Sequence, residues 1–105
     1  MRIEQPHTLG QQEAIVRVDR FLDGLIENPP GGATIKDPRK TWNANRLTFA
    51  FAITRGFFGT SFSGWIDVTE DRVVLEAELP SLVKTFLGEQ RVRQVIAEHL
   101  GNVLK

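Results

Sequence analysis

From Arg39 onward the chain alternates large hydrophobic residues with polar or small ones, and this period of two is typical of half-buried β-strands. Three short breaks interrupt the alternation, at Asn43–Asn45, at Arg55–Gly56 and at Glu70–Asp71. Asparagine, glycine and aspartate are common in tight turns because they bond their own backbone or adopt left-handed angles. The pattern therefore predicts consecutive antiparallel strands, and Pro80 is expected to end the last of them.

The parity of the positions also predicts how these strands pair. With a turn at Glu70–Asp71, the inward-facing pairs are Val68 with Val73, Ile66 with Leu75, Gly64 with Ala77, and Phe62 with Leu79. With a turn at Arg55–Gly56, the inward-facing pairs are Ile53 with Phe58, Phe51 with Thr60, Phe49 with Phe62, and Leu47 with Gly64. Both hairpins place the same residues inside, and a slip of one residue would turn every side chain to the other face.

Two stretches with helical spacing flank these strands. The first is expected to begin at Thr8, which forms a capping-box pattern with Gln11, and to end at the "NPPGG" of residues 28–32. The second is expected to run from about Glu89 to Leu104. Their hydrophobic stripes consist of Ile15, Val18, Leu22, Leu25 and Ile26 in the first helix, and Val92, Ile96, Leu100 and Val103 in the second.

The remaining segments complete the predicted fold. "RIEQP" near the start is a short alternating segment closed by Pro6, which favours an edge strand. Residues 33–40 are predicted to be a polar connector or frayed edge, and residues 81–88 a second connector with possible helical turns. The sequence thus predicts one α+β domain over residues 1–105. It is an antiparallel sheet of four to five strands in the order β-α-β-β-β-β-α, with two helices packed on one face.

The opposite face of this sheet is expected to carry small, uncharged side chains at its centre. A sheet face exposed only to water usually carries longer charged or polar side chains, so this pattern favours a contact surface, most simply for a second copy of the chain. An exposed sheet on which small residues are tolerated is the alternative. The candidate contact residues are Arg46, Thr48, Ala50, Ala52, Phe57, Ser61, Ser63, Trp65 and Glu76.

Composition narrows the functional classes. The chain has 13 lysines and arginines against 13 aspartates and glutamates, so it lacks the basic surplus that favours non-specific binding to nucleic acids or anionic membranes. It has no cysteine, which excludes disulfides and thiolate metal sites and fits a reducing cytoplasm. No stretch approaches the roughly 18 apolar residues typical of a membrane span.

Few residues suggest catalysis. His7 is expected at a strand-to-helix turn and His99 near the end of the last helix, and neither has a partner at the spacing of a metal or catalytic motif. Asp67, Glu76 and Glu78 should lie on the outer face, where paired acids could act as acid and base or hold a divalent cation. Acidic residues are also common at exposed strand positions, so an enzyme is the least favoured interpretation and no cofactor is expected.

Several short motifs, in order along nearly the whole chain, resemble the putative polyhydroxyalkanoic acid system protein family. They are Pro6-His7-Thr8-Leu9-Gly10, Trp42-Asn43-x-Asn45, and Val74-x-Glu76 through Pro80, followed by the closing amphipathic helix. The family is named for bacterial gene neighbourhoods concerned with polyhydroxyalkanoate storage granules. The resemblance implies a context of storage granules, but it provides no catalytic residues to carry over to this chain.

Two functional hypotheses follow. The first is a non-enzymatic accessory or interaction protein of polyhydroxyalkanoate storage, cytoplasmic and homodimeric, that contacts granules or granule-associated proteins. The second is a small-ligand binder in which a slot between the sheet and the C-terminal helix takes an acyl chain. The second rests on a sheet rich in phenylalanine under a long helix, although a core of this size normally fills itself with such rings.

Overall fold

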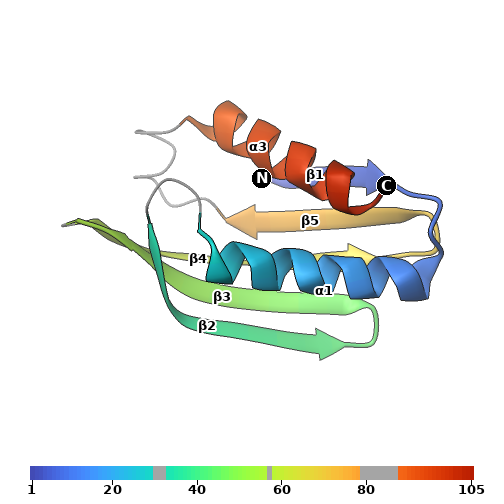
Figure 1. The fold of residues 1–105 in the computed structure, drawn as a ribbon, viewed down its shortest axis with the longest axis horizontal. Helices are drawn as coiled ribbons and strands as arrows, with labels where there is room; N and C mark the ends of the chain where they lie inside the picture. The colour runs from blue at the N-terminus through green and yellow to red at the C-terminus, as the bar shows by residue number, and fades with distance from the viewer. Residues whose placement is uncertain (30–32, 57, 79–87) are drawn as a thin grey trace.

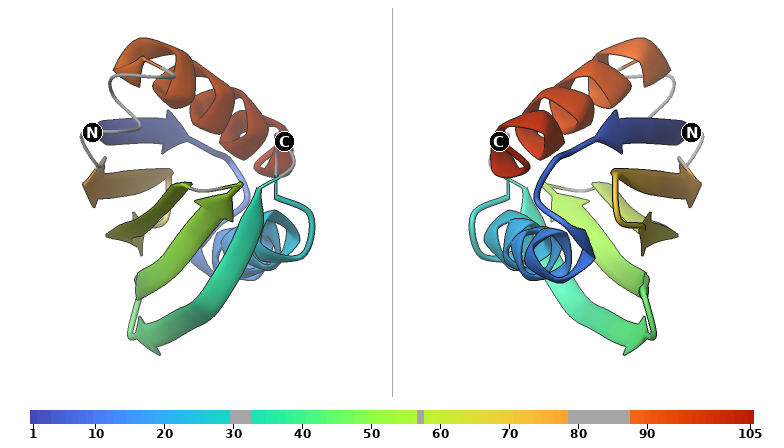
Figure 2. Two further views of the ribbon diagram at one scale, coloured as in Figure 1. Left: turned by 90° about the vertical axis from the view of Figure 1, so that its left-hand side faces the viewer. Right: turned by 90° about the vertical axis from the view of Figure 1, so that its right-hand side faces the viewer.

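The computed structural model of the protein describes residues 1–29, 33–56, 58–78 and 88–105. Its elements, in chain order, are β1 (Arg2–Pro6), α1 (Gln11–Glu27), β2 (Thr34–Asn43), β3 (Arg46–Arg55), β4 (Phe58–Val68), β5 (Arg72–Glu78) and α3 (Glu89–Val103). The strands form one antiparallel sheet in the order β1-β5-β4-β3-β2 (Figure 1). Both helices lie on the same side of the twisted sheet, which confirms the predicted α+β fold (Figure 2).

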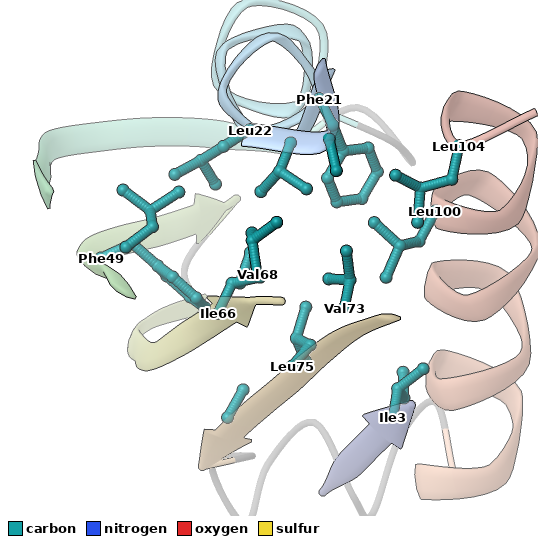
Figure 3. Close-up of a cluster of buried hydrophobic side chains, with 14 residues drawn as sticks. Ile3, Phe21, Leu22, Phe49, Ile66, Val68, Val73, Leu75, Leu100 and Leu104 are labelled. Atoms are coloured by element: carbon teal, nitrogen blue, oxygen red, sulfur yellow. The ribbon is translucent and has the colours of Figure 1, made fainter. Parts of the chain in front are cut away.

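The hydrophobic core lies between the sheet and the two helices. Figure 3 shows side chains from the sheet and from both helices pointing toward one another. Its largest fully buried side chains are Leu47, Ile66, Leu100, Val18, Val68 and Val73. Each came from a position that the sequence pattern assigns to the inner face of a strand or to the hydrophobic stripe of a helix. The inner face of the sheet is thus the core, as predicted, and the opposite face remains uncovered by any described element.

The two long hairpins differ in how well their pairing was predicted. In the β4–β5 hairpin, Val68 pairs with Val73 and Ser63 with Glu78, as expected, while Leu79 lies outside the described residues. In the β3–β4 hairpin the predicted pairing was wrong by two residues: Phe51 pairs with Phe62 instead of Thr60. The inward pairs of this hairpin are Ile53 with Thr60, Phe51 with Phe62, Phe49 with Gly64, and Leu47 with Ile66.

The cause of this error is the position of the turn. Arg55 is paired with Phe58 in the sheet and therefore does not belong to the turn, contrary to the prediction. Gly56 has a φ of 61°, a left-handed angle that glycine adopts without steric cost at the start of such a turn. Moving the turn by one residue changes the pairing by two, which is a full period of the strand, so the inner and outer faces are unchanged.

The predicted start of the strand before Asn43 was also wrong. Residues 34–40, predicted as a polar connector or frayed edge, belong to β2, an edge strand of the sheet that continues to Asn43. An irregularity between Lys36 and Arg39 interrupts its pairing with β3, and Asp37 within it has a φ of 51°. This bulge hides the alternation in the sequence, because it inserts an extra residue into the period of two.

The N-cap of helix α1 lies two residues later than the predicted Thr8. Gly10 is its N-cap, no side chain of its own first turn caps it, and Thr8 is exposed. The backbone N–H of Gln11 instead donates to a carboxylate oxygen of Glu70, 3.2 Å away on the β4–β5 turn. The capping acceptor therefore comes from a distant part of the chain, where a local motif cannot indicate it. The end of α1 at Glu27 and the bounds of α3 agree with the predictions to within a residue.

Candidate contact face

The candidate site is the uncovered side of the sheet, which we call the contact face. Its centre consists of the outward residues Thr48, Ala50 and Ala52 on β3 and Ser61 and Ser63 on β4. Each of these lies between inward-facing neighbours, because side chains alternate along a strand. The structure therefore brings the predicted contact residues onto one surface, except for Phe57, which lies outside the described residues. Their use in binding stays a prediction.

One end of the contact face carries a fixed group of polar side chains. Arg46 donates to both carboxylate oxygens of Asp67, at 2.7 and 2.8 Å, and its guanidinium lies 4.2 Å from the centre of the Trp65 ring. The hydrogen bonds to Asp67 raise the pKa of Arg46 above its ordinary value. The bidentate pair with Asp67 positions the guanidinium of Arg46 over the ring, and this stacking restricts the orientation of Trp65.

The same end continues across β5 and β1 as a chain of ion pairs. Arg2 contacts Glu4 at 3.1 Å and Glu76 at 3.3 Å, and Arg72 lies 3.7 Å from Glu4. Val74 lies among them on the outward side of β5 and is only 8% exposed. Opposite charges therefore compensate one another here, and the predicted contact residue Glu76 already has a cationic partner.

The two lateral margins of the contact face, on β2 and on β5, differ in charge. Strand β2 presents Lys36 and Arg39 outward, since they are the pairing partners of Ala52 and Ala50. On the far side of the small residues, β5 presents Glu78, the pairing partner of Ser63. The small centre of the face is therefore flanked by a basic margin on β2, where Lys36 and Arg39 outnumber the exposed Asp37 of the bulge, and by an acidic margin on β5.

The acidic residues considered for catalysis are separated by these partners. Asp67 is bonded to Arg46 and Glu76 to Arg2, while Glu78 is exposed two residues further along β5. Ion pairs thus occupy two of the three carboxylates. Among the described residues, no group of three or more histidine, aspartate and glutamate side chains is placed to hold a metal ion.

His7 lies at the expected strand-to-helix turn and is buried there, with 7% of its surface exposed. Its Nε2 donates to the main-chain oxygen of Thr69 at 3.0 Å, and its Nδ1 accepts from the N–H of Leu9 at 3.2 Å. The main-chain N–H of His7 also donates to Asp71. Hydrogen bonds of His7 therefore connect the β1–α1 segment to the β4–β5 turn. Both ring nitrogens take part in hydrogen bonds.

A partly exposed polar cluster between α1 and the edge strand β2 was not predicted from the sequence pattern. Lys40 points inward and contacts Asp19 at 2.8 Å and Asp23 at 2.6 Å, and the Trp42 indole N–H donates to Asp19 at 2.9 Å. The hydrogen bonds from Lys40 and then Trp42 lower the pKa of Asp19. Burial lowers the pKa of Lys40, but its hydrogen bonds to Asp19 and Asp23 outweigh burial and raise it. The only signal in the sequence was the spacing of the two aspartates by one helical turn.

An open groove of about 600 Å³ lies between the two helices. Phe21, Leu25 and Val103 contribute hydrophobic walls, and Arg20 and His99 contribute polar ones. The slot predicted between the sheet and the C-terminal helix is a different place, and there Leu100 and Leu104 are buried in the core at 0% and 5% exposure. Hydrophobic packing thus fills the described part of that space.

Comparison with known proteins adds the family context to this geometry. The model of the family described as putative polyhydroxyalkanoic acid system protein matches residues 1–104. The chain belongs to this family. No curated protein and no solved structure gives a significant match. The description of this family is consistent with an association with polyhydroxyalkanoate storage. None of the described helices is long and apolar enough to cross a membrane.

Proposed function

We propose that this protein is a non-enzymatic accessory protein of bacterial polyhydroxyalkanoate storage that works in the cytoplasm by binding through its contact face. The family membership supports the context. The observation that carries the mode of action is the contact face itself, whose small centre around Ala50 and Ser63 lies beside the fixed side chain of Trp65. Small side chains let another surface approach closely, and an ordered aromatic ring is a common anchor at protein interfaces.

The first partner in this proposal is a second copy of the chain, and the remaining surfaces of the dimer contact granules or granule-associated proteins. A two-layer fold with one helix-covered sheet face leaves its other face available for such pairing. Interfaces between identical copies about a two-fold axis are self-complementary, so one face serves both subunits.

The test combines solution mass with granule binding. Light scattering over a concentration series is expected to give twice the chain mass for the natural protein and the chain mass for Ala50→Glu, because the carboxylate would be buried at the interface. Val16→Glu is the matched control, since Val16 is 41% exposed on α1, away from the contact face. A monomeric natural protein, or a dimer that Ala50→Glu leaves intact, would contradict the assignment of this face.

Granule binding is measured by sedimentation with purified polyhydroxybutyrate granules. The natural protein and Val16→Glu are expected to sediment with the granules. If the natural protein stays in the supernatant with bare granules but sediments with granules that retain their native protein coat, the contact is with a granule protein. Absence of sedimentation with both preparations would refute the storage role proposed here.

A second candidate function, binding of a small amphipathic ligand, is favoured by the groove between the helices. Its hydrophobic walls at Phe21 and Leu25 suit an acyl chain, and Arg20 at the margin suits an anionic head group. Mass spectrometry of the purified protein is expected to detect a co-purified acyl species if this function is present. A clean spectrum, together with a melting temperature that hydroxyacyl compounds do not change, would refute it.

A further inference from the structure

The charges on the contact face are arranged so that the face complements a copy of itself. One row of paired residues crosses four strands in the order Arg39, Ala50, Ser63, Glu78. Arg39 and Glu78 are exposed, and neither forms an ion pair within the described part of the chain. The row is therefore basic at one end, acidic at the other, and small in between.

We propose that two copies stack face to face about a two-fold axis that runs parallel to the strands, between β3 and β4. This inference rests on the proposed function, which assigns the face to self-association. Rotation about this axis exchanges β3 with β4 and β2 with β5. Arg39 of each copy then faces Glu78 of the other, and the two small residues Ala50 and Ser63 face each other across the interface.

The neighbouring row supports the same axis. It crosses the sheet as Thr41, Thr48, Trp65 and Glu76. The rotation places the ring of Trp65 against the shorter side chain of Thr48 of the other copy, so the two large rings do not collide. A large side chain on one half of the face thus meets a short side chain on the other half, as a self-complementary surface requires.

Charge selects this axis over the other way of stacking the two faces. An axis perpendicular to the strands would lay β2 over β2, and the basic margins with Lys36 and Arg39 would then face each other. Like charges brought together at an interface are unfavourable, whereas opposite charges fix the orientation of the partners. The acidic margin at Glu78 would be left without its basic counterpart in that arrangement.

Charge reversal tests the axis directly. We expect Arg39→Glu and Glu78→Arg each to raise the dimer dissociation constant about tenfold at low salt, since each reversal converts two attractive contacts into repulsive ones. The double variant with both reversals is expected to restore the natural dissociation constant to within about twofold, because it re-forms the pairs with exchanged signs. Glu98→Arg, an exposed reversal on α3, is the control and is expected to leave dimerisation unchanged.

The outcomes separate this inference from the function on which it rests. Rescue in the double variant supports the parallel axis. The axis would be overturned if the single reversals had no effect, or if the double variant dimerised no better than the single ones. In either case, loss of the dimer in Ala50→Glu would still support the contact face as the site of self-association. A natural protein that remains monomeric over the whole concentration series would overturn both.

Discussion

At the scale of single residues, Gly64 shows how closely β4 and β5 approach each other. A Cβ atom at this position would collide with the main-chain oxygen of Glu76 and lie 2.8 Å from the Cα of Ala77. These neighbours are backbone atoms, so the strands would have to move apart. We expect Gly64→Ala to lower the free energy of unfolding by about 1–3 kcal/mol, measured by urea denaturation at fixed protein concentration.

The matched control is Gly24→Ala in α1. A Cβ there would meet no atom within 4 Å, and Gly24 lies in the last turn of the helix. Alanine has the higher helix propensity, so this substitution is expected to raise the free energy of unfolding by about 0.4–1 kcal/mol. Opposite signs for the same chemical change would assign the loss at Gly64 to the close approach of the strands. Equal effects at both positions would contradict that explanation.

Asp19 is the residue whose charge state should matter most on the acid side. Its pKa is lowered in the folded state by hydrogen bonds from Lys40 and Trp42, so its contribution to stability is present above its unfolded pKa. That contribution is lost as the pH falls through the lowered folded pKa. Because Asp19 and Lys40 are partly exposed, with side chains 35% and 26% accessible, we expect only about 1 kcal/mol at pH 7.

Urea denaturation of the natural protein and Asp19→Asn at pH 7 and pH 2.5 measures this contribution. The difference between the two proteins should be largest near pH 7 and should shrink as the acid pH protonates Asp19. Lys40 has the opposite dependence: its raised pKa implies a contribution that is lost as the pH rises through the folded value, in the alkaline range. If the two proteins differed in their free energy of unfolding by the same amount at pH 7 and pH 2.5, the charge of Asp19 would not be the source of the difference.

At the scale of elements, the start of α1 depends on a residue far away in the sequence. Glu70 accepts from the N–H of Gln11, and its negative charge lies at the positive end of the helix dipole. We expect Glu70→Ala to lower the free energy of unfolding by about 1 kcal/mol and Glu70→Gln by less, because glutamine retains an acceptor. Thr8→Ala should have almost no effect on the free energy of unfolding. A loss as large as that of Glu70→Ala would support the capping box predicted at Thr8.

The pattern of hydrophobic and polar residues could predict the faces of the strands but not their pairing register. Alternation specifies which face of a strand is buried, and it did so correctly even for β3 and β4, whose pairing was wrong by two residues. A shift of two leaves every side chain on its face, so hydrophobicity gives no penalty that could correct the register. The turn decides it, through the left-handed angle of Gly56.

The same limits apply to the candidate site. The outward residues around Ala50 could be predicted because they follow from parity alone. The fixed stack of Arg46 on Trp65 and the cluster of Lys40 with Asp19 could not, since both depend on which strands and helices become neighbours in space. Lys40 shares the inward parity of Trp42, but no sequence pattern indicates that its Nζ reaches Asp19 and Asp23 of α1.

At the scale of the whole molecule, the fold is thin, with extents of 42 × 26 × 20 Å. Two helices bury the inner face of a five-stranded sheet, and the sheet has a second face of similar extent that they cannot reach (Figure 2). Stability then has two sources: the core within one chain and, in our proposal, the contact between two chains. These sources respond differently to protein concentration, since only the second depends on mass action.

Thermal unfolding over a range of concentrations separates the two sources. If unfolding of the dimer yields two unfolded chains, a hundredfold increase in concentration adds about 1.4 kcal/mol of stability per chain, which is half of the roughly 2.7 kcal/mol per dimer. For a domain of this size the melting temperature should rise by roughly 5 °C. Ala50→Glu should melt at a temperature that does not depend on concentration, and Val16→Glu should behave as the natural protein does. A natural protein with a constant melting temperature would show that the core of one chain supplies all of the stability and that the contact face does not pair with itself in this range.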